Sequence, residues 1–134
     1  MKRYTNIILL CLLLPFAWFG CEKDYPIDED GLLITQRGEC YVSNFELLGP
    51  DFQTVRSKNP VIDTVAGTIH VEVFFGTDLK NLYPQFSLIT DAKLEPKITG
   101  KVDFSDLGKP RTYTVISGNR KVRKPYQVII TVQQ

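Results

Sequence analysis

The chain has 134 residues, of which 43% are hydrophobic and 23% charged, and its formal net charge at pH 7 is +1. This length predicts one domain. Residues 1–20 hold two basic and no acidic residues, so the remaining 114 carry a formal charge near −1. A charge this close to zero argues against nucleic-acid binding, which depends on a strongly basic face.

The first 20 residues have the pattern of a secretory signal peptide. Lys2 and Arg3 precede an apolar stretch from 7 to 19, and the small Gly20 stands directly before Cys21. The 14 residues from 7 to 20 are fewer than the roughly 20 that a membrane-spanning helix needs. The Gly20–Cys21 pair resembles the lipobox of bacterial lipoproteins, in the looser form typical of Bacteroidetes. We therefore expect 1–20 to be a lipoprotein signal peptide and Cys21 to carry acyl chains that hold the protein on a membrane.

Residues 21–38 are predicted to form an acidic, flexible tether. Residues 22–31 hold Pro26, Gly31 and five acids (Glu22, Asp24, Asp28, Glu29 and Asp30). These acids resemble the export signals of surface lipoproteins in Bacteroidetes, and a solvated tether without an export role is the alternative. Residues 32–35 are expected either to add a short strand or to pack loosely.

The rest of the chain shows the patterns of strands. Residues 68–75 alternate, which predicts a half-buried strand with Ile69, Val71, Val73 and Phe75 facing inward. Further strands are predicted at 41–48, 85–89, 112–117 and 126–132, the last with Tyr126, Val128, Ile130 and Val132 inward. Val42 is out of phase with Phe45 and Leu47, which predicts a bulge near Ser43 and Asn44. Residues 78–82 are the one segment where we expect a helical turn, capped by Thr77 or Asp78.

Turn signals separate these segments at the spacing of an all-β sandwich, with glycine or proline at positions such as 49–50, 59–60, 67, 76, 100, 108 and 118. Each amphipathic strand must bury one face, so two packed antiparallel sheets are the simplest arrangement. We expect one antiparallel β-sandwich of about seven strands over residues 39–134.

Several short runs carry a family likeness: 66–69, 75–79 with 82–84, 103–105, 113–115 and 126–128. They resemble the immunoglobulin-like domain of uncharacterised Bacteroidetes surface lipoproteins, which are often linked to polysaccharide uptake. The resemblance covers roughly residues 42–132. Gly67 and Gly76 are expected to adopt turn conformations, with positive φ at Gly76. Tyr113 and Tyr126 are expected to bury their rings with hydroxyls near backbone, Tyr113 in the role of a tyrosine corner.

Chemistry-bearing residues are sparse. His70, the only histidine, stands two residues from Glu72 on the outward face of a strand, and a metal would need a third ligand. Asp103 and Asp106 fall in a turn, where aspartate caps backbone amides. Cys40 is expected to be a small buried residue, with an intermolecular thiol as the alternative. We expect no enzyme activity, no metal site and no cofactor.

Two features are candidates for ligand binding. Six basic residues without an acid lie between 109 and 124, and four of them crowd one loop (Arg120, Lys121, Arg123 and Lys124). They form either a solvated hairpin tip or an anion-binding rim for acidic glycans, lipopolysaccharide phosphates or an acidic partner. Exposed aromatic rings could stack on a sugar, with Phe74 ranked ahead of Phe52 and Tyr83.

The sequence thus predicts an outer-membrane lipoprotein, displayed at the cell surface, that binds or scaffolds and is accessory to glycan capture or uptake. Its expected partners are the membrane, through the lipid, and a glycan or an envelope protein. The alternative is a structural subunit of an outer-membrane protein complex that binds no glycan.

Overall fold

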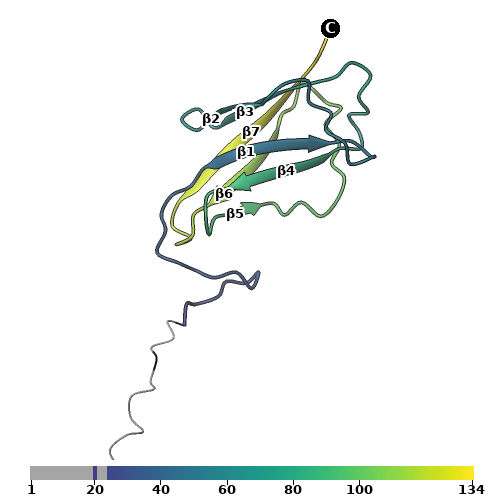
Figure 1. Ribbon diagram of the computed structural model, residues 1–134. Helices are drawn as coiled ribbons and strands as arrows, with labels where there is room; N and C mark the ends of the chain where they lie inside the picture. The colour runs from purple at the N-terminus through teal and green to yellow at the C-terminus, as the bar shows by residue number, and fades with distance from the viewer. Residues whose placement is uncertain (1–19, 21–23) are drawn as a thin grey trace, which may run out of the picture.

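The two predicted sheets are present in the computed structural model, which describes residue 20 and residues 24–134 (Figure 1). Seven strands run in the order β1 (Val42–Leu48), β2 (Val61–Asp63), β3 (Thr68–Val73), β4 (Tyr83–Leu88), β5 (Lys93–Glu95), β6 (Arg111–Ile116) and β7 (Arg123–Val132). The prediction of an all-β sandwich of about seven strands is confirmed. The predicted signal peptide, except for Gly20, and the predicted lipid site at Cys21 lie outside the described residues.

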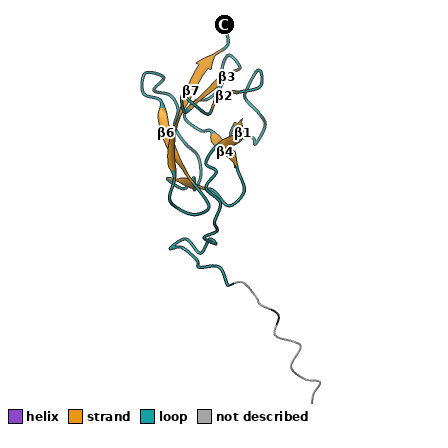
Figure 2. Cartoon of the chain, turned by 90° about the vertical axis from the view of Figure 1, so that its left-hand side faces the viewer, coloured by secondary structure: helices purple, strands orange, loops and turns teal. Residues whose placement is uncertain are grey.

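One layer of the sandwich is a two-stranded sheet, β1–β4, and the other is a five-stranded sheet of order β2–β3–β7–β6–β5 (Figures 1 and 2). β1 pairs with β4 in antiparallel register, and the register shifts between Val42 and Asn44, where the bulge was predicted. The bulge returns Phe45 and Leu47 to the inner face, where both are fully buried.

The larger sheet contains one parallel pair of strands, where two antiparallel sheets were predicted. β3 runs parallel to β7, with Thr68 opposite Gln127 and Val73 opposite Val132, whereas its other pairs are antiparallel. A parallel pair needs a long crossover connection. Here the chain leaves β3, crosses to the other sheet as β4, and returns through β5 and β6 before it reaches β7.

The core lies between the layers and follows the predicted alternation. Ile69, Val71 and Val73 of β3 face it, as do Tyr126, Val128 and Ile130 of β7. From the smaller sheet, Phe86 meets Phe45 edge to face with ring centroids 4.9 Å apart, and it lies at the same distance from Tyr113 of β6. The Tyr126 hydroxyl accepts a hydrogen bond from the Val42 amide at 3.4 Å, so it links the two sheets.

Three local predictions are corrected, and one open alternative is decided. Phe75 does not face inward: β3 ends at Val73, and the Phe75 side chain is 83% exposed. Residues 78–82 form no helix: Asn81 N donates to Asp78 O at 3.4 Å in a single turn, and Leu82 already forms a bridge with Val102, although Asp78 accepts the expected capping bond from Lys80 N. Tyr113 buries its ring without a tyrosine-corner hydrogen bond among the described residues. Residues 32–35 form no strand, which excludes the first of the two expected alternatives; of these residues, Leu33 forms an isolated bridge with Ile27.

Candidate functional site

The four basic residues from 120 to 124 do not form one free surface. The Arg120 guanidinium points back into the molecule: Nε binds Asp28 Oδ2 at 3.0 Å, Nη1 donates to the carbonyls of Asp91 and Ser117, and Nη2 donates to Leu33 O. Only 16% of its side chain is exposed. Arg120 therefore acts as an internal hub in this conformation.

The other three basic side chains have different surroundings. Arg123 of β7 forms an ion pair with Glu95 of β5, which lies beyond β6 in the same sheet. Lys124 lies over the ring of Tyr126, with Nζ 5.7 Å from the ring centroid. Lys121 is exposed, and no ion pair is formed by it within the described part of the chain. The positive charge predicted for this loop is thus partly neutralised by the protein's own acids.

Three exposed aromatic residues, Phe52, Phe74 and Phe75, lie in the segments that follow β1 and β3. Phe74 follows β3 and is 47% exposed, as the alternation predicted. Its amide donates to Val55 O, so the segment after β3 lies beside the loop that follows β1. That loop carries Phe52, which is 62% exposed.

Phe52 and Tyr83 form a stacked pair. Their ring centroids lie 4.8 Å apart and their planes differ by 24°. Tyr83 begins β4 opposite Leu48 of β1, so it stands on the outer face of the two-stranded sheet. One face of the Phe52 ring therefore rests on Tyr83, and the large exposed fraction leaves the other open to water.

The backbone holds Phe52 in a conformation that few side chains adopt. Its φ is +60°, in the left-handed region that glycine or asparagine usually occupies. A tight turn fixes this geometry, because Phe52 N donates to Gly49 O at 2.9 Å and Gly49 N donates to Gln53 O at 2.9 Å. Such a conformation costs on the order of 1–3 kcal/mol and is enriched at functional sites.

Polar side chains flank the stacked pair on the same face. Glu46 and Gln85 lie opposite each other on β1 and β4, two residues from Leu48 and Tyr83. Glu46 Oε1 accepts from Thr54 Oγ1 at 2.8 Å and pairs with Arg56 Nε at 2.9 Å. Hydrogen bonds from the Leu47 amide, Thr54 and Arg56 outweigh partial burial and lower the pKa of Glu46. An apolar ring with fixed charged and amide groups beside it can hold a ligand with one apolar face and a polar rim, which is the shape of a pyranose.

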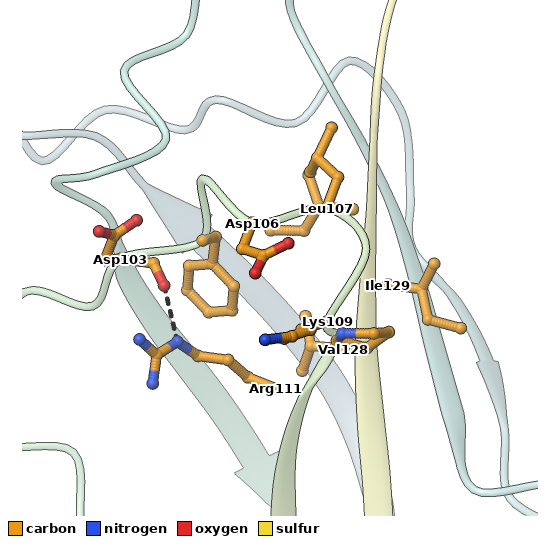
Figure 3. A pocket seen from close by; sticks show the side chains of 10 residues that line it. Asp103, Asp106, Leu107, Lys109, Arg111, Val128 and Ile129 are labelled. Atoms are coloured by element: carbon orange, nitrogen blue, oxygen red, sulfur yellow. Dashed lines mark hydrogen bonds between the residues drawn. The ribbon is translucent and has the colours of Figure 1, made fainter.

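A second feature is a hollow of about 300 Å³ beside β6 and β7 (Figure 3). Arg111 crosses it, with Nε donating to Asp103 O at 2.6 Å and the guanidinium carbon 5.9 Å from the Phe104 ring centroid. Asp103 caps Ser105 N at 2.8 Å and Asp106 caps Gly108 N at 3.2 Å, as predicted for this turn. The hydrogen bonds from Ser105 lower the pKa of Asp103 and keep it ionised. Its carboxylate is therefore suited to fixing the turn and unsuited to donating a proton.

The remaining predicted residues are accounted for by local contacts. His70 is exposed, and Glu72 pairs with Lys58 Nζ at 2.9 Å and Ser57 Oγ at 2.6 Å. Cys40 is a half-buried free thiol that donates to Val115 O at 3.1 Å, and burial raises its pKa. Within residues 24–134, no three histidine, cysteine or acidic side chains gather in a way that could hold a metal ion. In the same part of the chain, no helix is long and apolar enough to span a membrane.

Phe52 and Tyr83 were both predicted from the sequence as candidates for stacking on a sugar, but Phe74 was ranked above them. The alternation of the strand directly predicts that Phe74 points outward. The stacking of Phe52 on Tyr83 depends instead on the positive φ of Phe52, which no sequence period reports. The available signal was the Gly49–Pro50–Asp51 turn directly before an aromatic residue. The sequence did not point to the polar group formed by Glu46, Thr54 and Arg56. Glu46 takes its place on the outer face because the bulge in β1 shifts the phase of the strand, and Thr54 and Arg56 reach Glu46 because the loop after β1 folds back along it.

Residues 51–130 of the chain, more than half of its length, match the family described as "SGBP, N-terminal". No functionally curated protein matches the sequence.

Two solved structures from Bacteroides share the fold. A Bacteroides thetaiotaomicron protein described as a putative glycoside hydrolase is 27% identical with a TM-score of 0.60, over 72% of this chain and 26% of that one. A DUF4623 family protein from Bacteroides eggerthii is 18% identical with a TM-score of 0.54, over 72% of this chain and 22% of that one. The chain therefore spans about a quarter of each of these longer proteins.

Proposed function

Since the chain belongs to the SGBP N-terminal family, a glycan-related family of Bacteroidetes surface proteins, we propose that it is a non-enzymatic module of the cell envelope that assists glycan capture or uptake. We further propose that acyl chains on Cys21 anchor it to the outer membrane and that it is displayed outward. Several acyl chains on one residue hold a protein firmly, because each buried methylene contributes about 0.8 kcal/mol.

The observation that carries the glycan role is the Phe52–Tyr83 pair. An exposed ring is costly to leave in water, and this ring is held on a strained backbone against a second ring. The open face of Phe52 would stack on the C–H face of a sugar. Glu46, Arg56 and Gln85 would then meet its hydroxyl groups, since carboxylate, guanidinium and amide groups all form hydrogen bonds with hydroxyls.

Affinity electrophoresis and calorimetry against a panel of polysaccharides test this proposal. We expect at least one polysaccharide to bind, and Phe52→Ala and Tyr83→Ala each to weaken its binding by about 1–2 kcal/mol, or roughly five- to thirtyfold in Kd. Phe75→Ala is the matched control, because Phe75 is more exposed but lies outside the stacked pair. Binding that is unchanged by the two substitutions, or equally weakened by Phe75→Ala, would contradict the assignment.

The alternative is a structural subunit of an outer-membrane complex that makes contact through a sheet edge. Both edge strands of the larger sheet, β2 and β5, have only three residues each. Short edges are a common protection against edge-to-edge pairing, so the larger sheet is a poorer surface for such a contact than the smaller one, whose strands β1 and β4 have seven and six residues. A pull-down from detergent-solubilised envelope that recovers a stoichiometric protein, with no polysaccharide bound, would favour the structural alternative.

A further inference from the structure

Part of the predicted acidic tether, from Pro26 onward, is folded against the sandwich. Its chain reverses between Pro26 and Ile34, where Ile34 N donates to Pro26 O at 2.7 Å and Asp28 N donates to Leu32 O at 2.9 Å. Ile27 and Leu33 form a bridge across this reversal. The expected flexible tether is therefore a folded turn over this stretch, which leads into β1 (Figure 1).

Asp28 fastens this turn to the larger sheet. Only 3% of its side chain is exposed, and Oδ2 lies 2.9 Å from Lys93 Nζ on β5 and 3.0 Å from Arg120 Nε. Its other oxygen accepts from the amides of Asp30 and Leu32. An ionised carboxylate that is removed from water needs such a set of partners. Lys93 also binds Asp30 at 2.9 Å and Glu29 at 3.3 Å, so three of the predicted tether acids pair with the same lysine.

Arg120 holds the turn through hydrogen bonds of its guanidinium group to Asp28 and to the Leu33 carbonyl. Its φ is +61°, so the hairpin between β6 and β7 directs the side chain across the end of the sandwich. The guanidinium then joins Leu33 of the N-terminal segment to the Asp91 carbonyl in the β4–β5 loop. Three segments that are far apart in sequence are thus connected by one side chain.

Gly118 provides a second, uncharged fit between the segment and the hairpin. A Cβ at this position would lie 2.6 Å from Thr35 Oγ1, 2.9 Å from Asp91 Cβ and 3.2 Å from Arg37 Cβ. Thr35 N donates to Gly118 O at 2.9 Å, and Asn119 N donates to Arg37 O at 2.8 Å. The segment can lie this close only because residue 118 has no side chain.

We propose that residues 26–37, here named the clasp, hold the sandwich in a fixed orientation relative to its N-terminal attachment. The hairpin at 117–122 then faces the membrane, and the opposite end, which carries Phe52, faces outward. The membrane part rests on the proposed anchoring at Cys21. Seven peptide units separate Cys21 from Asp28, which at full extension is about 25 Å, so the clasped end cannot move far from the lipid surface.

Hydrogen–deuterium exchange of the full chain tests the clasp without reference to lipid or glycan. We expect the amides of Ile34 and Thr35 to be protected, and Asp28→Lys and Gly118→Val each to abolish this protection while β3 and β7 stay protected. Glu29→Gln is the matched control, because Glu29 also approaches Lys93 but its side chain is 84% exposed. Unprotected amides in the parent chain, or protection that survives both substitutions, would overturn the proposal.

Fluorescence quenching on lipid vesicles tests the orientation. A fluorophore is placed at Val65→Cys, before β3, or at Lys80→Cys, beyond its other end, in the lipidated chain; the half-buried Cys40 thiol, with its raised pKa, reacts poorly. With quencher-bearing lipids we expect stronger quenching at position 65, and Gly118→Val to reduce the difference. Equal quenching in the parent chain would overturn the fixed orientation. A chain that fails to associate with vesicles would refute the anchoring, while the exchange experiment would still decide the clasp.

Discussion

At the scale of single residues, glycines are placed where the chain has no room for a side chain. Gly67 stands at the turn before β3 with φ of +69°, and a Cβ there would lie 2.5 Å from the carbonyl oxygen of Pro125. Gln127 N donates to Gly67 O at 2.8 Å, so the turn is fixed to β7 at this point. Conformation and close approach both require glycine here.

Gly67→Ala is therefore expected to destabilise the fold. The left-handed backbone alone accounts for about 1–3 kcal/mol, and the displaced Pro125 carbonyl adds to it. Urea unfolding followed by circular dichroism measures the change. Gly100→Ala is the control, because nothing lies within 4 Å of its added Cβ and its φ is not in the left-handed region. Equal stability of the two variants would contradict the close approach.

Two non-glycine residues with positive φ carry the features that matter most for function, Phe52 in the proposed platform and Arg120 beneath the clasp. Gly67 could be assigned to a turn from its sequence, because glycine is the residue that turns favour. Phe52 and Arg120 could not, since nothing in either residue type signals a left-handed backbone. Their geometry is imposed by the loops around them.

At the scale of elements, the smaller sheet depends on its aromatic contacts. Two strands alone are marginal in water and need a partner surface. Phe45 of β1 supplies much of it: the side chain is fully buried and meets Phe86, which in turn contacts Tyr113 in the opposite layer. This row of rings joins the two sheets.

Phe45→Ala should accordingly cost about 3–5 kcal/mol, a large part of the stability of a small domain. If this variant does not fold, Phe45→Leu, which keeps most of the volume, should cost less than about 1.5 kcal/mol and remain measurable. Thermal and urea unfolding give both values. The matched control is Phe75→Leu, which we expect to be nearly neutral because that ring is 83% exposed. A similar loss in the control would show that burial does not account for the effect.

The long strands were predictable and the short ones were not. β1, β3, β4, β6 and β7 have six or more residues, enough for a period of two to appear, and each was predicted within three residues of its bounds. β2 and β5 have three residues each, too few for any period, and they were not identified individually. Phe75 was assigned inward by extending the alternation past Val73, but the strand ends there because the chain turns at Gly76, whose φ is +81°.

At the scale of the whole molecule, charges connect segments that are remote in sequence. Lys93 and Arg120 meet Asp28 across separations of 65 and 92 residues. The sequence located the acids and the bases, but it offered an export signal or a solvated tether for the acids and a solvated hairpin tip or an anion-binding rim for the bases. It did not pair the two groups, because a sequence pattern does not report which distant loops converge. The acidic segment and the basic hairpin were predicted as separate features, but they contact each other through Asp28 and Arg120.

These pairs make the fold sensitive to acid. The Lys93 ammonium and the amides of Leu32 and Asp30 hold the pKa of Asp28 far below its usual range. Hydrogen bonds also lower the pKa of Asp30, Glu72 and Asp78. A carboxyl group whose pKa is lower in the folded than in the unfolded state stabilises the fold fully above its unfolded pKa, near 4. That contribution is lost as the pH falls toward the folded value.

We therefore expect the free energy of unfolding to be nearly constant between about pH 6 and 8 and to fall steadily below about pH 5. The loss should extend to the acidic end of the curve, because the folded pKa of Asp28 lies well below its usual range. Urea unfolding at closely spaced pH values measures the curve. Asp28→Asn should lower stability at pH 7 and flatten the acid slope, whereas Glu29→Gln should leave both nearly unchanged. A slope that persists in full in Asp28→Asn would show that the clasp contributes nothing to the acid response, and would place it in the carboxylates of the sheets.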